Sequence, residues 1–284
     1  MTAACIILNY NDPESTIKLV EQVRNYNIFS RIFVIDGHST DDSIEVISRC
    51  FSKISKIKIV EARKNGGYGY GNNYGIRLAL MEGYQYAVVC NPDVEFSEDT
   101  IKTCMDFIQI HPECAAVAPK IDKGNLIKFA PPIKDICFSN LLLNKIVKPR
   151  YYNNSYFAGK EWVYVDAIPG SLVLFDINKF NAVGLYDERV FLYHEEIIVG
   201  RKFQRAGYRS AVLLNKTFKH MHSVSVRKTF KQSIKPRKIA ARSQRYYLKE
   251  YCNANLGELV LFDILQPISN LEAFVWIRFF KHGR

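Results

Sequence analysis

Apolar runs alternate with amphipathic stretches through the first 120 residues. Five runs have the length and the branched apolar content of buried strands: "AACIILN" (3–9), "RIFVID" (31–36), "IKIVEA" (57–62), "YAVVC" (86–90) and "AAVAP" (115–119). Between them, apolar residues three or four positions apart predict helices that begin at Pro13 and near Asp41-Asp42, and that cover 72–83 and 97–110. This alternation predicts an α/β fold with a mostly parallel sheet and helices on both faces.

The pattern becomes less regular after residue 120. Residues 120–160 are loop-like, whereas "GSLVLF" (170–175) and "SAVLL" (210–214) are typical of strands. A helix is predicted over 194–207, with Gly207 ending it, and two helices broken by Gly257 and Pro267 follow in the last fifty residues. The pattern therefore predicts a domain over 1–225, with halves 1–120 and 121–225, followed by a C-terminal helical extension over 226–284.

Composition narrows the class of protein. The chain has 284 residues, and its 48% hydrophobic content excludes a disordered protein. The start lacks the basic residues of a signal peptide, and no charge-free apolar run approaches the ~18 residues of a membrane span. The seven cysteines show no C-x-x-C spacing, and Cys5 and Cys90 lie inside apolar runs, so we expect reduced core thiols. These features favour a cytoplasmic protein.

The net charge of +11 is unevenly distributed. Residues 216–249 contain 11 Lys and Arg and no Asp or Glu, a number equal to the whole excess. Such a segment attracts phosphates, nucleic acid or an anionic membrane, although a solvated helical face has the same composition.

Two carboxylates follow predicted strands. Asp36 ends the second strand, and Asp93 follows the fourth in "NPDVEF". Because ligands bind at the carboxyl edge of open α/β sheets, we favour functional roles over turn capping for this pair. Asp36 could accept a hydrogen bond from a nucleobase N–H or a ribose hydroxyl, and Asp93 could bind a divalent cation that neutralises a diphosphate.

A glycine-rich segment, "NGGYGYGNNYG" (65–75), follows the third strand. The dinucleotide fingerprint belongs to the first strand–helix turn, and that turn, "NYNDPE", contains no glycine. We therefore expect the segment to let the backbone approach a nucleotide diphosphate, with Asn72 or Asn73 opening the helix.

Two further pairs carry titratable groups. Glu195 and Glu196 are adjacent at a predicted helix start, and neighbouring helical positions point about 100° apart. One glutamate can therefore position while the other acts as a base, although acids also complement a helix dipole there. His220 and His222, in "KHMHSVS", lie on one face of an extended segment, and sets of His and Asp bind Mn²⁺.

Taken in order, these segments resemble the family 2 glycosyltransferases, which are inverting sugar-nucleotide enzymes with the Rossmann-like GT-A fold. The resemblance covers roughly residues 3–225, and "NPDVEF" and "FLYHEE" are most similar to the rhamnosyltransferase-like branch of bacterial polysaccharide synthesis. It rests on these segments: "ILNYND", "VIDGHSTDDS", "NGGYGYGNNYGI", "NPDVEF", "DAIPGSLVLF", "VGLYDERVFLYHEEIIVGRKFQRAGYR" and "KHMHS".

The resemblance implies a role for each candidate residue. Glu196 would be the general base, with Glu195 placing it. Asp93 would hold Mn²⁺ or Mg²⁺, with His220 or His222 as a further ligand. Asp36 would contact the nucleotide base. The remaining donor-site residues would be Asn9, Tyr10, Asn65, Gly66, Gly67, Asn72 and Asn91.

The resemblance also implies partners. A UDP- or dTDP-sugar would be the donor, and a glycan or lipid-linked glycan of the cell surface would be the acceptor. Half 1–120 would bind the nucleotide and half 121–225 the acceptor. Three residues depart from the family pattern: Asn91 stands where many members have a first Asp, Gly37 replaces a common Asn, and Glu196 replaces Asp.

Several alternatives stay open at this stage. A nucleotidyltransferase would carry a basic, glycine-rich loop after the first strand, and "NYNDPE" is neither basic nor glycine-rich. A nucleic-acid-binding module would leave the carboxylates without a role. The Glu-for-Asp change keeps a non-catalytic nucleotide-binding subunit open. The basic, aromatic C-terminal region predicts either a peripheral helix on an anionic membrane at the inner face of the plasma membrane, or helices that pack on the domain or form a homodimer.

Overall fold

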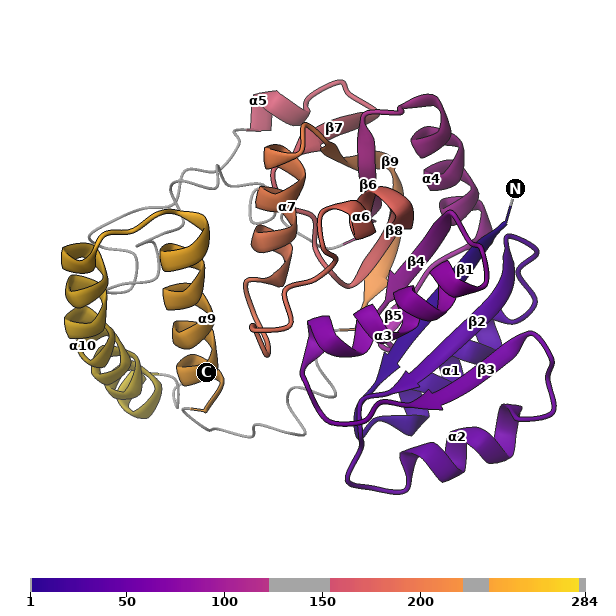
Figure 1. Ribbon diagram of the computed structural model, residues 1–284, viewed down its shortest axis with the longest axis horizontal. Helices are drawn as coiled ribbons and strands as arrows, with labels where there is room; N and C mark the ends of the chain where they lie inside the picture. The colour runs from indigo at the N-terminus through magenta and orange to yellow at the C-terminus, as the bar shows by residue number, and fades with distance from the viewer. Residues whose placement is uncertain (1, 123–153, 222–234, 281–284) are drawn as a thin grey trace.

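The computed structural model describes residues 2–122, 154–221 and 235–280 (Figure 1). Most of the loop-like stretch over 120–160 lies outside the described residues, and so does His222. Figure 1 shows a layered α/β domain, with the two C-terminal helices lying beyond it as the outermost elements.

A nine-stranded sheet forms the centre of the domain, in the order β3-β2-β1-β4-β8-β6-β9-β5, with β7 pairing β9. Strands β1, β2, β3 and β4 pair in parallel, and so do β6 and β9, whereas β8 runs antiparallel between β4 and β6. The strands are β1 (Ala3–Asn9), β2 (Phe29–Asp36), β3 (Ile57–Glu61), β4 (Tyr86–Cys90), β5 (Val94–Glu95), β6 (Cys114–Ile121), β7 (Trp162–Val165), β8 (Leu172–Asp176) and β9 (Arg209–His220). The predicted, mostly parallel sheet is confirmed, with β8 running against its direction in the middle and β5 and β7 pairing antiparallel with β9.

Helices cover both faces of this sheet, as the alternation predicts. They are α1 (Pro13–Val23), α2 (Ser43–Phe51), α3 (Tyr68–Met81), α4 (Glu98–Ile110), α5 (Asn154–Phe157), α6 (Ile177–Ala182), α7 (Glu195–Arg205), α9 (Lys235–Tyr251) and α10 (Leu256–Phe280). Successive strand residues point to opposite faces. In β1, Cys5 and Ile7 belong to the apolar cluster with α1, α2 and α4, whereas Ala4 and Ile6 belong to the cluster with α3, α6 and α7.

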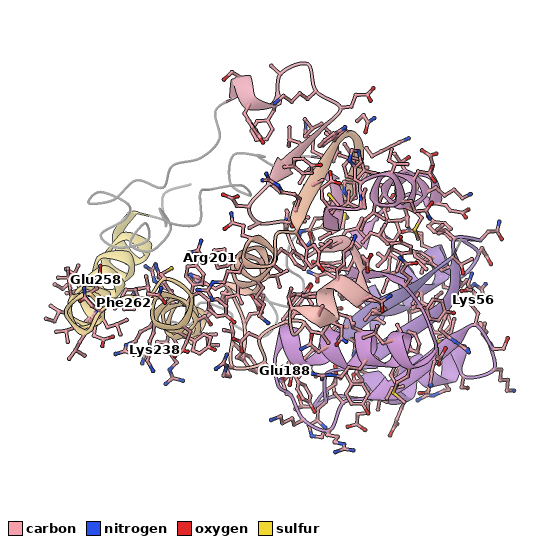
Figure 2. The ribbon with its side chains drawn as sticks, turned by 45° about the horizontal axis from the view of Figure 1, so that its top comes forward. Lys56, Glu188, Arg201, Lys238, Glu258 and Phe262 are labelled. Carbon is pink, nitrogen blue, oxygen red and sulfur yellow. The ribbon has the colours of Figure 1, made fainter. Side chains whose placement is uncertain are left out.

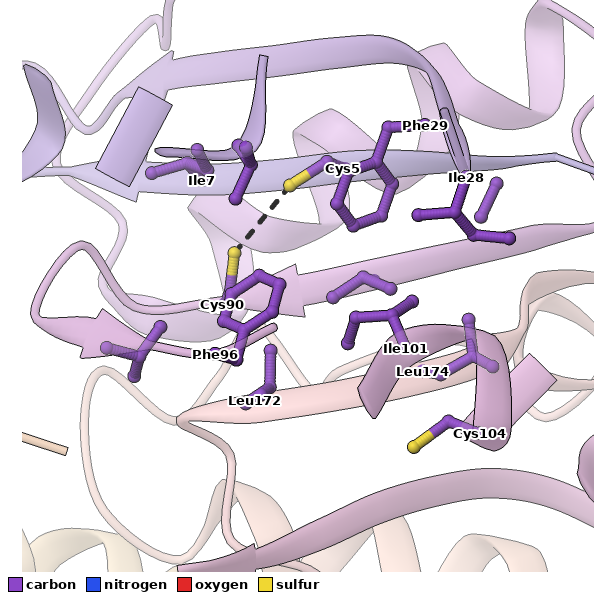
Figure 3. Packing of buried hydrophobic residues seen from close by; sticks show 14 of the residues in the cluster. Cys5, Ile7, Ile28, Phe29, Cys90, Phe96, Ile101, Cys104, Leu172 and Leu174 are labelled. Carbon is purple, nitrogen blue, oxygen red and sulfur yellow. Dashed lines mark hydrogen bonds between the residues drawn. The ribbon is translucent and has the colours of Figure 1, made fainter. Parts of the chain in front are cut away.

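The first of these clusters contains the two strand cysteines (Figure 3). The sulfur atoms of Cys5 and Cys90 lie 3.8 Å apart, and both residues are buried and free. The expectation that they are core residues is confirmed.

Three boundaries differ from the sequence prediction by more than two residues. Helix α3 begins at Tyr68 rather than at residue 72, so Asn72 and Asn73 do not open it but lie buried in its second turn. Strand β9 continues to His220. Pro267 lies inside α10 and does not break it, because a proline removes one helical hydrogen bond while packing of Leu259 and Phe262 against α9 remains.

Helix α9 packs directly on the domain. Its Tyr247 and Tyr251 form a small apolar cluster with Val190 and Ile198. Beside this cluster, the Asp187 carboxylate accepts hydrogen bonds at 2.7 Å from the hydroxyls of Tyr246 and Tyr251. The sequence left membrane binding and packing on the domain as alternatives for the C-terminal region, and α9 packs on the domain.

Candidate active site

The carboxyl ends of the parallel strands meet at one edge of the sheet, as the sequence predicts. Asn9 and Asp36, the last residues of β1 and β2, are partners in the parallel register. Because β8 is antiparallel to β4, its beginning lies at the same edge, and the Asn91 amide donates to the Ser171 carbonyl at 2.9 Å. Residues from both halves of the chain therefore converge there.

The Asp36 carboxylate organises the ends of the first two strands. It is 1% exposed and accepts hydrogen bonds from Asn9 Nδ2 at 2.8 Å, Ser39 N at 2.8 Å and Ser39 Oγ at 2.7 Å. Asn9 Oδ1 accepts in turn from Thr16 at 2.8 Å. A carboxylate offers about four acceptor positions, so these three bonds leave Asp36 capacity for one more contact. Tyr10, the next residue after Asn9, is half-buried.

The glycines of residues 65–75 serve close packing. Gly67 has φ +86°, and a Cβ there would lie 1.9 Å from the Phe191 carbonyl oxygen. Along α3, a Cβ at Gly71 or Gly75 would meet β1 side chains at about 2.5 Å. Packing of α3 on β1 therefore requires Gly71 and Gly75, and the approach of Phe191 requires Gly67. Contact of this segment with a diphosphate stays a prediction. A Cβ on Gly66 would lie 2.4 Å from the Tyr70 ring.

Two asparagines flank these glycines. Asn65 is exposed, and its Oδ1 accepts from the Gly67 amide at 3.2 Å. Asn72 donates to the Tyr68 carbonyl at 3.0 Å, and its buried Oδ1 has no hydrogen-bond partner among the described residues. Asn73 instead holds the segment before α7, because it accepts from Tyr186 N at 3.0 Å and donates to Glu188.

Asp93 and His220 come together, as expected for ligands of one ion. The short strand β5 pairs with the end of β9, Met221 N donates to the Asp93 carbonyl, and His220 Nε2 lies 3.3 Å from Asp93 Oδ1. Asp93 is 8% exposed. In the described part of the chain, no group of three or more His, Cys, Asp or Glu side chains could hold a metal. One carboxylate and one imidazole fit a cation whose other ligands are substrate phosphates and water.

A cavity of about 400 Å³ opens beside this pair. Its lining includes His220, Asn91, Tyr68, Gly170 and the glutamate pair at the start of α7. Asp36, Asn9, Tyr10 and the segment 65–67 do not line it. The predicted residues therefore fall into two groups along one edge: the ends of β1 and β2, and the cavity next to Asp93.

The two glutamates have different surroundings within the cavity. Glu196 Oε1 faces the Gly170 amide at 3.4 Å, and the Gly170 carbonyl accepts from the Tyr68 hydroxyl at 2.6 Å. Glu195 is 5% exposed, and its Oε1 has no hydrogen-bond partner within the described residues. The pair therefore presents one carboxylate held by a backbone amide and a second that is buried beside it.

Burial and the closeness of the two carboxyl groups favour the protonated form of this glutamate pair. Burial raises the pKa of Glu195 to about 8, and the neighbouring Glu196 carboxylate adds to the rise. Burial also raises the pKa of Glu196. The His194 imidazole, whose two nitrogens are buried without partners among the described residues, has a pKa lowered by burial to about 4 and is neutral. Such a site binds and releases protons near neutral pH.

The backbone that precedes α7 is strained. Tyr193 and His194 are not glycines, yet their φ values are +69° and +71°. Left-handed backbone of this kind costs of order 1–3 kcal/mol per residue and clusters at functional sites. Gly200 lets α7 pack closely against the backbone at Asp166, since a Cβ on Gly200 would lie 1.8 Å from the Asp166 carbonyl oxygen. These features fix where the first turn of α7 places Glu195 and Glu196.

Tyr68, Ser171 and His194 are among the cavity residues that sequence reasoning missed. Ser171 and His194 lie within or beside the segments "DAIPGSLVLF" and "FLYHEE", which marked the region without singling them out. Tyr68 lies in the glycine-rich segment, but its hydrogen bond to Gly170 joins residues 102 positions apart. No local pattern signals a contact of that kind.

Comparison with known proteins points in the same direction as this geometry. A family model described as "Glycosyl transferase family 2" matches residues 4–168. The low-salt glycan biosynthesis hexosyltransferase Agl10 of Haloferax volcanii is 25% identical over 197 residues, covering 68% of this chain and 58% of that protein. The N-acetylglucosaminyl-diphospho-decaprenol L-rhamnosyltransferase of Mycobacterium tuberculosis is 22% identical over 196 residues, covering 63% and 62%. The chain thus spans about three fifths of the length of these relatives.

Solved structures share the fold at low sequence identity. GalNAc-T7 with UDP, GalNAc and Mn²⁺ superposes with a TM-score of 0.67 at 14% identity, covering 87% of this chain and 47% of that one. The mannosyltransferase PcManGT of Pyrobaculum calidifontis with GDP-Man and Mn²⁺ gives 0.61 at 13%, covering 99% and 75%. S. aureus TarS 1–349 with UDP-GlcNAc gives 0.53 at 16%, covering 97% and 81%. These likenesses show the fold.

Proposed function

The chain belongs to glycosyl transferase family 2, and from that premise we propose that it moves a sugar from a nucleotide-sugar donor to a glycan or lipid-linked glycan acceptor, with inversion at the anomeric carbon. Its fold is the GT-A fold of the family. The observation that carries the proposal is the cavity lined by Glu195, Glu196 and His220, where the His220 imidazole lies 3.3 Å from the Asp93 carboxylate.

Glu196 is the general base of the proposed reaction. Inversion requires in-line attack by an acceptor hydroxyl, and a carboxylate must take its proton as attack proceeds. The Gly170 amide at 3.4 Å orients Glu196, and Tyr68 holds Gly170 in turn. Burial raises the pKa of Glu196, which makes its carboxylate a stronger proton acceptor. Glu195 shares the proton of the pair and places its neighbour.

Asp93 and His220 would hold Mn²⁺ or Mg²⁺ in the working enzyme. The ion would supply positive charge against the diphosphate that departs from the sugar. Two solved neighbours contain Mn²⁺, which supports a divalent ion in this fold. Asn91, which lines the cavity beside His220, would contact the sugar or the diphosphate as a neutral group.

Residues 1–120 would bind the nucleotide, and residues 121–225 the acceptor. Asp36 retains capacity for one contact to the base, and the half-buried Tyr10 would pack against the nucleoside. The other proposed donor contacts are Asn9, Asn65, Gly66, Gly67 and Asn72. Asn72 is the member of this set with an unpartnered buried oxygen in the described residues, and a donor hydroxyl would satisfy it.

The acceptor class rests on the relatives. The Mycobacterium tuberculosis relative is named for a decaprenol-linked diphosphosugar, and the Haloferax volcanii relative for glycan biosynthesis. A lipid-linked glycan of cell-surface polysaccharide synthesis, met at the cytoplasmic face of a membrane, is therefore the acceptor that we propose.

A donor panel tests the proposal. The full chain is incubated with UDP-, dTDP- and GDP-sugars and Mn²⁺ or Mg²⁺, and release of nucleoside diphosphate is measured with and without acceptor. We expect release from one donor class, and proton NMR of the product should show the inverted anomer. Release of pyrophosphate from a sugar 1-phosphate and a nucleoside triphosphate would instead identify a nucleotidyltransferase. No release from any donor would favour a non-catalytic subunit, and a retained anomer would contradict inversion.

A further inference from the structure

One side of helix α10 is apolar and exposed. Residues at helical spacing carry exposed fractions of 47–77%, although Leu259 and Phe262 on another side of the helix already pack on α9. At 100° per residue the exposed positions span an arc of about 140°, and between residues 256 and 271 this arc contains no charged residue. They are Leu256, Val260, Leu261, Ile264, Ile268 and Leu271.

A row of cations lies next to this arc. Lys238, Arg242 and Lys249 are exposed on one side of α9, at spacings of four and seven residues. Arg245 belongs to the same side of α9 and binds Asp263 of α10 through three contacts of 2.8–3.0 Å. Asp263 lies one turn from Val260 on α10. The Arg245–Asp263 pair therefore joins the cationic row to the apolar arc, and we call the two together the C-terminal surface.

We propose that the C-terminal surface docks the protein on an anionic membrane. The apolar arc would enter the boundary between headgroups and acyl chains, while the cations of α9 would lie against anionic headgroups. In Figures 1 and 2, α10 is the element farthest from the sheet, with Lys238 on the neighbouring α9 and Glu258 and Phe262 on α10. A flat surface could therefore reach α10 without touching the described part of the catalytic domain.

The charges favour a membrane over a second copy of the chain. A symmetric contact between two apolar arcs would bring the two cationic rows together, and like charges oppose such a contact. An anionic bilayer complements the same row. Within residues 2–122, 154–221 and 235–280, no helix combines the length and the apolar character needed to cross a bilayer. The geometry is that of a helix lying on the surface.

The position of α9 connects this surface to the cavity. Ser243 Oγ of α9 donates to the Leu192 carbonyl at 2.8 Å, and Tyr247 packs at 6.2 Å from the His194 ring. Leu192 and His194 both line the cavity. Docking through α10 would therefore hold the cavity at a fixed height above a bilayer. That placement suits a lipid-linked acceptor, but docking itself does not depend on the proposed reaction.

Vesicle co-sedimentation of the full chain tests the proposal. The probes are phosphatidylcholine vesicles with and without phosphatidylglycerol, at low and high salt. We expect binding that needs phosphatidylglycerol and weakens with salt. The triple variant Lys238→Gln/Arg242→Gln/Lys249→Gln should weaken binding on the order of 100-fold, because each surface cation contributes about a factor of five. The double variant Ile264→Glu/Ile268→Glu should abolish it.

Matched controls use exposed residues elsewhere. Ile110→Glu on α4 changes an isoleucine that is 74% exposed, and Lys18→Gln/Arg49→Gln/Lys53→Gln removes three exposed cations from and beside α1 and α2. Both should bind as the wild type does, and circular dichroism should show every variant folded. Wild-type protein that stays in the supernatant at low salt would overturn the proposal. So would a dimer, measured by sedimentation velocity, that dissociates in Ile264→Glu/Ile268→Glu while vesicle binding is absent.

Discussion

Tyr251→Phe tests whether the Asp187 carboxylate anchors α9 to the catalytic domain. The Asp187 side chain is 5% exposed, and Arg189 binds it through two contacts of 2.9 Å. Its Oδ2 also accepts from Tyr246 and Tyr251, both at 2.7 Å. Burial alone would raise the pKa of Asp187. The hydrogen bonds from Arg189, Tyr251 and Tyr246 outweigh burial and hold this pKa well below its usual range. The carboxylate is therefore charged wherever the protein is folded near neutral pH.

The expected cost follows from this geometry. Tyr251→Phe removes one hydrogen bond to a charged, buried acceptor, and such bonds contribute about 1.5–3 kcal/mol. If α9 opens locally, its amide protection against hydrogen exchange should fall about 10- to 150-fold. Tyr246 is half-buried, so water can replace its hydroxyl, and Tyr246→Phe should cost about 0.5–1.5 kcal/mol.

Hydrogen–deuterium exchange with peptide resolution over 235–251 provides the assay. Tyr208→Phe is the matched control, because the Tyr208 hydroxyl makes no hydrogen bond within the described part of the chain. A depressed pKa stabilises the fold above the ordinary aspartate value of ~3.9 and loses that effect only as pH falls toward the folded value. The Tyr251→Phe effect should therefore persist from pH 7 to pH 5. If the hydrogen-exchange protection of α9 in Tyr251→Phe stays within about twofold of wild type, Asp187 does not anchor α9 to the catalytic domain.

The remaining predictions concern the cavity and its walls. Because burial raises the pKa values of Glu195 and Glu196, kcat/KM should rise with pH through an apparent pKa well above the ordinary ~4.3, and a profile flat from pH 5 to pH 8 would contradict this. Because burial raises the pKa of Glu195 to about 8, this residue stabilises the fold at low pH and loses that effect as pH rises. The wild-type Tm should therefore fall between pH 5 and pH 8, and it should fall less in Glu195→Gln. Asp93→Ala should remove metal-dependent turnover and leave circular dichroism unchanged; full transfer at saturating Mn²⁺ would exclude Asp93 as a ligand. Gly67→Ala should cost about 2 kcal/mol or more, because it adds a Cβ at positive φ against the Phe191 carbonyl, and a Tm equal to wild type would argue against that packing.

The sequence predicts the first half of the fold well, because burial of one face of an element gives its apolar residues a regular spacing along the chain. Alternate residues of β1 separate into the two apolar clusters, and Ser97 accepts from Thr100 N at the start of α4, as its type suggests. The antiparallel β8 between β4 and β6 leaves no such period, since its neighbours in the sheet are set by contacts between residues far apart in the chain, from Val117 with Leu174 to Tyr86 with Asp176, and not by local sequence.

The candidate site likewise contains some residues that the local sequence places and others that it does not. Asp93 and His220 were placed by their positions at strand ends, and they do lie together. The glycine-rich segment 65–75 is predicted to approach a diphosphate, and the groups next to Gly67, Gly71 and Gly75 in the structure are Phe191, Leu8 and Ile6. Glycine marks a close approach, but the sequence does not say whether the approaching group is a ligand or another part of the chain. Tyr68 was missed because its partner, Gly170, lies in the other half of the domain.

The role of Glu196 as general base is the central claim, and one comparison tests it most directly. Glu196→Gln keeps the shape of the side chain and removes its basicity, and Glu195→Gln makes the same change one residue away. Sugar transfer and donor affinity are measured for both at saturating Mn²⁺, once the donor is known. We expect Glu196→Gln to lose transfer by ~10²–10⁴-fold while donor affinity stays near wild type, and Glu195→Gln to lose less. A dead Glu195→Gln beside an active Glu196→Gln would contradict the account.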